Sequence, residues 1–400
     1  MKAPDPEVSL FWITLCAVLA PLLAGFVPRK MLPEVVLLLV FGVVIGPNAL
    51  GLAVTDEAIG LLRELGLGML FLLAGYEVEL KELSGRGGRR ALVTWLICLA
   101  LAFVAVWLIG LSGAVHAEIA VAIALTSTAL GTLLPILKDA GMLGSPFGGA
   151  VLNHGAFGEL GPVVAMAVLL SARRPGLSIV VLAVFAALAV FMTLPWTRLQ
   201  HGTTRVMQLI RAGSETTGQT TVRLTVLLLV ALLVLASVFS LDAVLGAFAA
   251  GFILRRALPQ GDEQLEHKLN GLAFGFLIPV FFVTSGMAID PAAVAANPQG
   301  LISFVILILL VRGVPVYVAG RLQRNPLTGD RQFDRRDSLR LGLYGATGLP
   351  IIVAVTTTAV NAGQMTAANA SLLVAGGAVT VLALPMTATL LARNTADSTT

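Results

Sequence analysis

The feature that most constrains this chain is a series of apolar runs, each about 20 residues long, that recurs along the whole sequence. A bilayer core is about 30 Å thick, and an α-helix needs about 20 apolar residues to cross it. Only 12% of the 400 residues are charged, against roughly 25% in soluble domains. The sequence therefore predicts an all-α integral membrane protein. About 13 transmembrane helices are expected, at 8–27, 31–50, 58–79, 91–112, 116–137, 146–171, 177–196, 219–239, 241–258, 269–289, 299–320, 338–361 and 369–392.

The basic residues predict the orientation of these helices. Of 26 Lys and Arg residues, 21 fall in or beside alternate loops, which include 80–90, 197–218 and 321–337. Cytoplasmic loops of membrane proteins carry this excess of positive charge. The pattern predicts an outside N-terminus and a cytoplasmic C-terminus. It also explains the net charge of +4 without nucleic-acid binding.

The sequence predicts one transmembrane domain over residues 1–400. It has no phosphate-binding glycine motif, no zinc-protease motif, no serine-hydrolase elbow and no acidic metal cluster. We therefore expect no enzyme activity, no cofactor and no C-terminal regulatory domain. The two cysteines, Cys16 and Cys98, fall within apolar runs and favour neither a disulfide framework nor a metal site.

An internal repeat relates the two halves of the chain. The second and third runs, at 41–47 and 70–79, resemble the ninth and tenth, at 245–252 and 280–290. The offset is seven runs, and an odd offset inverts the second copy in the membrane. We expect inverted repeats over about 8–171 and 219–392, joined by a connector helix near 177–196. Such repeats are typical of secondary transporters.

Two runs in matching positions are interrupted by polar residues, glycine or proline. One interruption lies at Thr126, Ser127 and Thr128, with Gly131 after it, and the other at Gly348 and Pro350. Breaking a helix in lipid exposes backbone groups that cost several kcal/mol each if unpaired. Paired interruptions therefore point to a binding site near the middle of the membrane.

Two charged residues lie in the middle of predicted spans, Glu159 and Arg312. A charge at the centre of a bilayer is costly and is by default a functional-site hypothesis. Loss of hydration favours the protonated form of a lone carboxylate, and a nearby fixed positive charge favours its release. A carboxylate that alternates between a proton and a cation is the minimum equipment for cation:proton antiport.

Other polar residues have weaker assignments. Asn153 could bind the cation or bond across helices. His154 could relay protons, although an interior structural histidine is the favoured interpretation. Glu77, near the end of a span, could add a proton, but a structural role is favoured there too.

Several segments together resemble the sodium/hydrogen exchanger superfamily, and most closely its cation:proton antiporter-2 branch of Kef-type and bacterial Na⁺/H⁺ antiporters. The order and spacing of these segments make the resemblance, which covers nearly the whole chain. They are 33–47, 71–77, 124–131, 279–286 and 348–350.

The resemblance implies a homodimer in a bacterial cytoplasmic membrane, with a scaffold domain and a mobile core that moves the ion by an elevator-like shift. It implies that the two interrupted helices cross, that Glu159 is the ion carboxylate and that Arg312 balances its charge. Its substrates would be H⁺ and Na⁺ or K⁺, with a role in pH homeostasis. Family members often carry a second polar residue where this chain has Gly158, and Lys where it has Arg312. One titratable carboxylate and one permanent cation suggest a 1:1, electroneutral exchange.

We expect Glu159 to bind the proton or cation, with oxygens of Thr126, Ser127 and Thr128 completing a shell of hard ligands. Two alternatives remain open. One is an inverted-repeat symporter of organic solutes, and the other is a membrane sensor that transports nothing. A channel is a further possibility, distinguished by faster flux without proton coupling.

Overall fold

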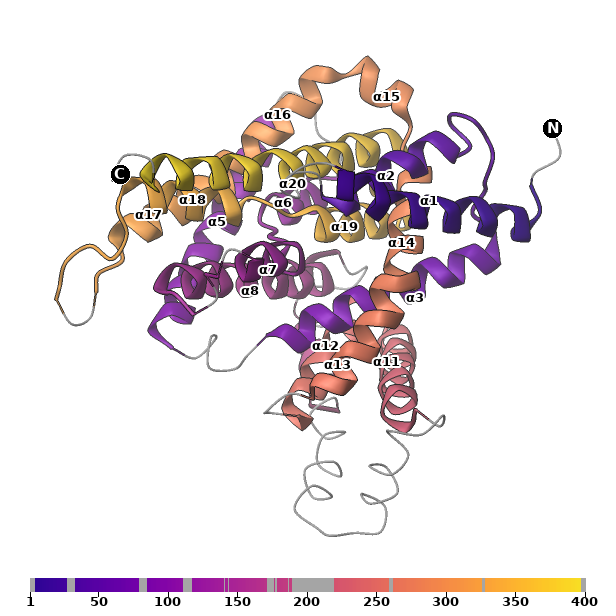
Figure 1. Cartoon of the computed structure of the whole chain (residues 1–400), viewed down its shortest axis with the longest axis horizontal. Helices are drawn as coiled ribbons and strands as arrows, with labels where there is room; N and C mark the ends of the chain where they lie inside the picture. The colour runs from indigo at the N-terminus through magenta and orange to yellow at the C-terminus, as the bar shows by residue number, and fades with distance from the viewer. Residues whose placement is uncertain are drawn as a thin grey trace, which may run out of the picture. The chain divides into compact units, whose positions relative to one another are not determined.

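The computed structural model describes residues 4–26, 33–78, 85–110, 117–139, 141–142, 144–170, 176, 178–185, 187–188, 219–258, 262–325 and 328–396. Helices account for nearly all regular structure in these ranges (Figure 1). The exception is an isolated bridge between Arg324 and Arg331. The prediction of an all-α chain is confirmed.

Among the described residues, eight helical stretches are long and apolar enough to cross a membrane. Six of them lie on predicted spans with little change at their ends. These six are α1 (Pro6–Phe26), α3 (Glu57–Glu77), α5 (Arg86–Gly110), α11 (Thr220–Val238), α16 to α17 (Pro298–Leu322) and α20 (Ala367–Ala396). The shorter apolar helices α2 (Glu34–Ile45) and α12 (Ala243–Ala257) fall on the second and ninth predicted spans. Of the connector predicted at 177–196, only 178–185 and 187–188 lie in the described residues, where the chain is helical.

Both spans with predicted interruptions are broken. One gives α6 (Glu118–Leu125) and α7 (Leu130–Asp139), and the other gives α18 (Arg335–Gly345) and α19 (Leu349–Asn361). Pro350 stands in the first turn of α19, where proline costs no hydrogen bond. The prediction of two discontinuous helices is confirmed.

The unwound segments between the half-helices touch each other. The N–H of Ala129 donates to the carbonyl of Thr347, and the hydroxyl oxygen of Ser127 lies 3.3 Å from the carbonyl oxygen of Gly348. A Cβ at Gly348 would clash with the Ser127 hydroxyl. Glycine at this position therefore allows the two breaks to meet, and their backbone groups pair within the protein as the absence of water requires.

One helix begins earlier than predicted, and one short helix was not predicted. The tenth span, predicted at 269–289, begins earlier, as α13 (Glu263–Leu272), and continues through the π-helical turn η3 (Ala273–Leu277) into α14 (Ile278–Met287). Asp262 caps α13 by accepting from the N–H of Leu265 over 3.0 Å. A short helix that the sequence did not predict, α15 (Pro291–Ala296), follows.

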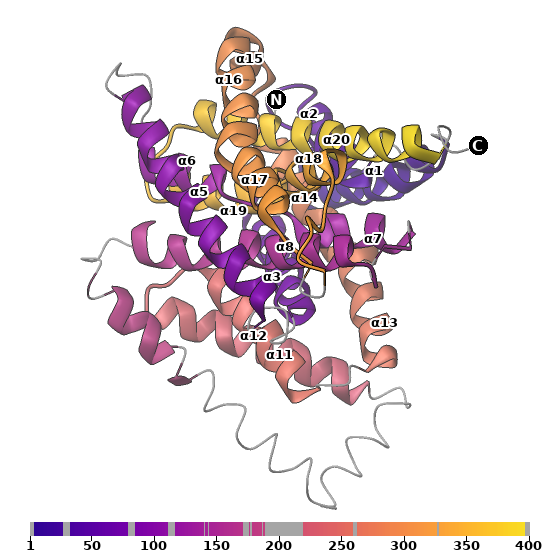
Figure 2. The same cartoon turned by 90° about the vertical axis from the view of Figure 1, so that its left-hand side faces the viewer.

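By its contacts the chain divides into two compact units. Unit 1 comprises Met1–Thr55, Leu80–Met166 and Phe282–Thr400, and it holds both broken helices and α8 (Pro146–Ala165). Within it, α7 and α8 lie side by side (Figures 1 and 2). Unit 2 comprises Asp56–Glu79 and Ala167–Phe281, in which α3 packs along α12.

Each unit contains a helix crossing built on two glycines. In unit 1, Gly42 of α2 and Gly286 of α14 face each other, and a Cβ at either would meet the backbone of the opposite helix. In unit 2, Gly251 of α12 and Gly75 of α3 do the same. Small residues let helix backbones approach this closely in membranes.

The two crossings have matching partners. A Cβ at Gly42 would strike the carbonyl oxygen of Val283, three residues before Gly286. A Cβ at Gly251 would strike that of Leu72, three residues before Gly75. The second span therefore contacts the tenth as the ninth contacts the third, which is the exchange of partners that a two-fold related repeat would produce.

We predict that Gly251→Ala lowers the stability of the protein by about 1–3 kcal/mol, because the methyl group must push two backbones apart. The measurement is the thermal unfolding of the detergent-solubilised protein. Gly271→Ala is the matched control, since a Cβ there has no atom within 4 Å. Equal melting temperatures for the two variants would contradict the close crossing.

Candidate functional site

The site is built on α8, which is buried over most of its length. The helix begins at Ser145, whose hydroxyl accepts from the N–H of Gly148 over 3.0 Å. Three glycines face neighbouring elements closely: Gly155 faces Leu130, Gly158 faces Thr128 and Arg312, and Gly161 faces the indole of Trp95. The missing side chains let the first broken helix and α5 approach α8.

Glu159 meets the first turn of α7. Its side chain is 4% exposed, and its Oε1 accepts from the N–H of Leu130 over 2.8 Å and from that of Gly131 over 3.3 Å. These N–H groups have no carbonyl partner within the helix because they belong to its first turn. The other carboxylate oxygen, Oε2, has no hydrogen-bond partner among the described residues.

Arg312 lies in a π-helical turn, η4 (Leu309–Gly313), and is fully buried. Its guanidinium reaches four separate elements. Nη2 donates to the carbonyl of His154 over 2.7 Å, Nε donates to the Thr128 hydroxyl over 3.1 Å and to the Gly345 carbonyl over 3.3 Å, and Nη1 lies 3.7 Å from Sγ of Cys98. It therefore ties η4 to α5, to α8 and to both breaks.

Arg312 makes no ion pair with Glu159 in the described part of the chain, where Arg340 and Asp337 form the ion pair that is seen. A balance of charge between Arg312 and Glu159 thus stays a prediction, and it would act without direct contact. Carbonyl oxygens and a hydroxyl, rather than a carboxylate, surround the guanidinium.

The three predicted hydroxyl residues of the first break are buried and already hydrogen-bonded. Thr126 donates to the Ile123 carbonyl over 2.8 Å, Ser127 to the Ala124 carbonyl over 2.7 Å and Thr128 to the Gly345 carbonyl over 2.5 Å. Their hydroxyl protons therefore point to carbonyls at the ends of α6 and α18. Oxygen lone pairs are then what they could offer a cation, and the Thr128 oxygen already accepts one bond from Arg312.

The remaining predicted residues are more scattered. His154 is 4% exposed, and Nδ1 of its ring lacks a partner among the described residues. Asn153 lies against Gly87 in the first turn of α5, and no contact with Glu159 is seen in the described residues. Glu77, at the end of α3, belongs to unit 2, whereas the other predicted residues belong to unit 1.

Sequence reasoning missed two site neighbours, Trp95 and Cys98. They stand one turn apart on α5, where Trp95 covers Gly161 and Cys98 contacts Arg312. Within an apolar run they have no distinctive local signal, and only the fold brings them to α8 and η4.

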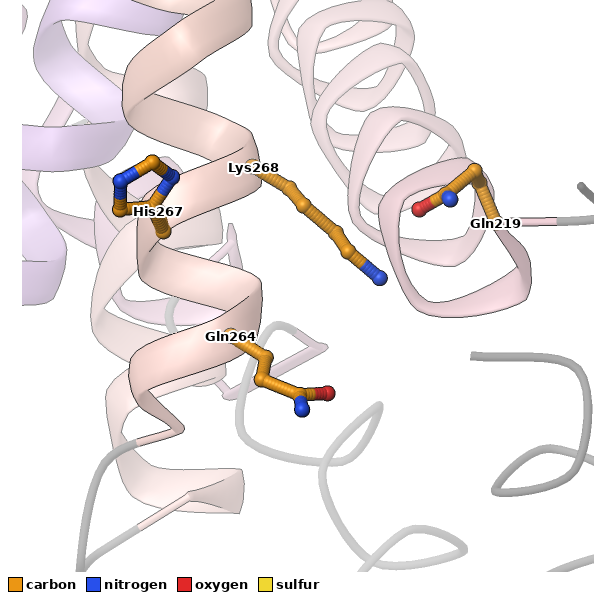
Figure 3. A pocket seen from close by; sticks show the side chains of 4 residues that line it. All are labelled: Gln219, Gln264, His267 and Lys268. Carbon is orange, nitrogen blue, oxygen red and sulfur yellow. The ribbon is translucent and has the colours of Figure 1, made fainter. Parts of the chain in front are cut away.

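No metal centre competes with this site in the described ranges. They contain no group of three His, Cys, Asp or Glu side chains that could hold a metal ion. A cavity of about 420 Å³ in unit 2 is lined by Gln219, Gln264, His267 and Lys268, and Lys268 of α13 extends toward Gln219 beside the start of α11 (Figure 3). It includes none of the predicted site residues.

Residues 14–393 match the family described as "Sodium/hydrogen exchanger, transmembrane". The chain belongs to this family. It is a membrane cation/proton antiporter and not an enzyme, as the sequence predicted. The match covers nearly the whole chain and includes both broken helices, Glu159 and Arg312.

The chain is also similar to known relatives and, in fold, to a solved structure. The chain is 24% identical over 292 residues to "Probable Na(+)/H(+) antiporter GerT" of Bacillus cereus, covering 70% of this chain and 74% of that protein. It is 22% identical over 365 residues to "Na(+)/H(+)-K(+) antiporter GerN" of the same species, covering 90% of each. Its fold resembles the sodium proton antiporter MjNhaP1 of Methanocaldococcus jannaschii, with a TM-score of 0.67 and 17% identity over 96% of this chain and 98% of the other.

We predict that Arg312→Lys destabilises the protein strongly, because one ammonium group cannot reach the separate acceptors that the guanidinium joins. Each buried acceptor left unpaired costs about 1–3 kcal/mol. Thermal unfolding in detergent measures the effect. Arg321→Lys is the control, since Arg321 makes one part-buried bond, to the carbonyl of Phe333. Similar melting temperatures for both variants would show that Arg312 does not hold the core together.

Proposed function

We propose that the chain exchanges Na⁺ or K⁺ for H⁺ by alternating access, with Glu159 as the residue that binds either ion. The supporting observation is a carboxylate that is almost completely buried against the start of α7 and has one oxygen, Oε2, without a partner among the described residues. In an apolar interior, such an oxygen needs a proton or a cation.

The coupling follows from competition at one group. A proton on Oε2 neutralises the carboxylate, and a dehydrated cation at the same oxygen does so in its place. Hard monovalent cations prefer oxygen ligands, and the hydroxyl oxygens of Thr126, Ser127 and Thr128 in the neighbouring break are the candidates to complete the shell. Because one carboxylate cannot hold both ions, each inward passage of one accompanies the outward passage of the other.

The stoichiometry follows from Arg312. Its guanidinium does not deprotonate in proteins, and it is bonded to the core at Thr128, His154 and Gly345. Glu159 is then the single group of this site that exchanges a proton for a cation, and the exchange is 1:1 and electroneutral.

We place the site in an architecture of two inverted repeats, over about 8–171 and 219–392, with a connector near 177–196. The matching glycine crossings of α2 with α14 and α12 with α3 support this proposal. We further propose that the chain belongs to the cation:proton antiporter-2 branch and forms a homodimer in a bacterial cytoplasmic membrane. Its N-terminus would lie outside, and its core would carry the ion by an elevator-like movement.

The decisive experiment compares wild type and Glu159→Gln in proteoliposomes with an acidic interior and a pH-sensitive dye. Adding Na⁺, K⁺ or Li⁺ outside should alkalinise the interior in wild type only. Glu118→Gln is the control, since Glu118 is exposed at the start of the same broken helix. Full exchange by Glu159→Gln would refute the assignment, and a folded wild type that responds to no cation would favour the organic-solute symporter or the sensor.

Electroneutrality makes a separate prediction. When a membrane potential is imposed with K⁺ and valinomycin, and Na⁺ and pH gradients are clamped, the rate of Na⁺/H⁺ exchange should not change. A rate that follows the potential would show that net charge moves in each cycle, and the 1:1 stoichiometry would then be wrong.

A further inference from the structure

In the described part of the chain, Glu159 meets the N-terminus of a half-helix and no basic side chain. We propose that the first turn of α7 is the positive partner of the Glu159 carboxylate: it stabilises the deprotonated form through Oε1 and leaves Oε2 as the oxygen that exchanges ions. This inference rests on the proposed function, because it assumes that Glu159 is the ion-binding residue.

The first support is the geometry at α7. The chain is unwound before Leu130, so the first turn of the ten-residue helix α7 starts at the site itself. The N–H groups of Leu130 and Gly131 both point at Oε1, at 2.8 and 3.3 Å. A helix N-terminus carries roughly half a positive charge, and hydrogen bonds from N–H groups to a carboxylate are among the stronger ones in proteins.

The second support is the engagement of Arg312. Its Nε and Nη2 donate to Thr128, Gly345 and His154. Gly345 is the last residue of α18, and the carboxyl end of a helix carries partial negative charge. The guanidinium of Arg312 therefore donates to the carboxyl end of α18, whereas Glu159 accepts from the amino end of α7.

The third support is the asymmetry of the carboxylate. Two donors bind Oε1, whereas Oε2 lacks a partner in the described residues, and the whole side chain is 4% exposed. A cation cannot approach Oε1 on the side of the N–H groups without repulsion from their positive ends. Proton and cation therefore compete at Oε2 while Oε1 stays bound to α7.

The elements packed against α8 carry several other ionisable groups. Beside the site are His154 on α8 itself, Arg312 on η4 and Cys98 on α5, which are joined through the guanidinium of Arg312. Tyr344 on α18 packs against Phe147, about three turns before Glu159, and the remaining groups stand at the start of α5, at the end of α7 and on the earlier part of α18: Arg86, Arg89, Arg90, Lys138, Asp139, Arg335, Arg336, Asp337 and Arg340. Glu118 stands at the far, exposed start of α6, and α19 carries no ionisable residue. A change in the pH profile after altering α7 backbone donors can thus be traced to the donors, because none of these groups is touched.

Gly131 allows a clean test. A Cβ at this position would meet no atom within 4 Å, so the Cβ of alanine or of proline strikes no neighbouring element. Gly131→Pro removes one of the two N–H groups that bind Oε1 and stands in the first turn, where proline is tolerated. Gly131→Ala keeps the N–H and is the matched control. Both variants are reconstituted in proteoliposomes, and Na⁺/H⁺ exchange is measured as a function of pH.

We expect the acidic limb of the profile to move to higher pH in Gly131→Pro, by about one pH unit relative to Gly131→Ala. The sign follows because a carboxylate that loses a donor is less stable in its charged form and keeps its proton to a higher pH. At alkaline pH the two variants should reach the same rate.

Identical pH profiles for the two folded variants would overturn this inference alone. The proposed function would still stand as long as Glu159→Gln is inactive, so the two failures are distinguishable. If Gly131→Pro does not fold, Leu130→Pro against Leu130→Ala decides the question with the shorter bond, since the preceding Ala129 is already outside the helix.

Discussion

The structure depends on how two interrupted helices satisfy their backbone in a place where lipid offers no hydrogen bonds. The break between α6 and α7 and the break between α18 and α19 bond to each other and to α8, through Ala129, Thr347 and the carbonyl of Gly158. The remaining polar ends are taken up by two buried charges. Glu159 accepts from the start of α7, and Arg312 donates to the end of α18. Each charge is thus stabilised by the end of one half-helix, the start of α7 for Glu159 and the end of α18 for Arg312.

This arrangement separates two roles that a simple ion pair would merge. Arg312 is bonded to several elements of the core and is always charged. In the described residues Glu159 accepts hydrogen bonds on one oxygen, and we propose that the proton or cation binds at the other. A fixed cation and a carboxylate lie within one compact unit. A bound proton or cation would cancel the charge of the carboxylate, while Arg312 keeps its own charge.

Much of the fold was predictable because membrane spans have strong local signals. The run of apolar residues predicted the helices, and the polar residues at 126–128 with Pro350 predicted the breaks, since proline suits the start of a helix. Glu159 was predictable as a lone acid in an apolar run. The partners of Arg312 were not, because His154 and Thr128 are 158 and 184 residues away in sequence. The backbone donors of α7 were missed because Glu159 lies 29 residues beyond Leu130. Almost every residue has a backbone N–H group, so the residue types do not show which of these groups binds a carboxylate. The role of Gly158 also needed the fold, which places Thr128 and Arg312 where its side chain would be.

The central claim is that one carboxylate holds either a proton or a cation. The most direct measurement is the number of protons released when Na⁺ or K⁺ binds to purified protein in weakly buffered detergent solution, for wild type and for Glu159→Gln. We predict that wild type releases one proton for each cation that it binds, and that the variant neither binds the cation nor releases a proton. Cation binding without proton release, or release that persists in Glu159→Gln, would contradict it.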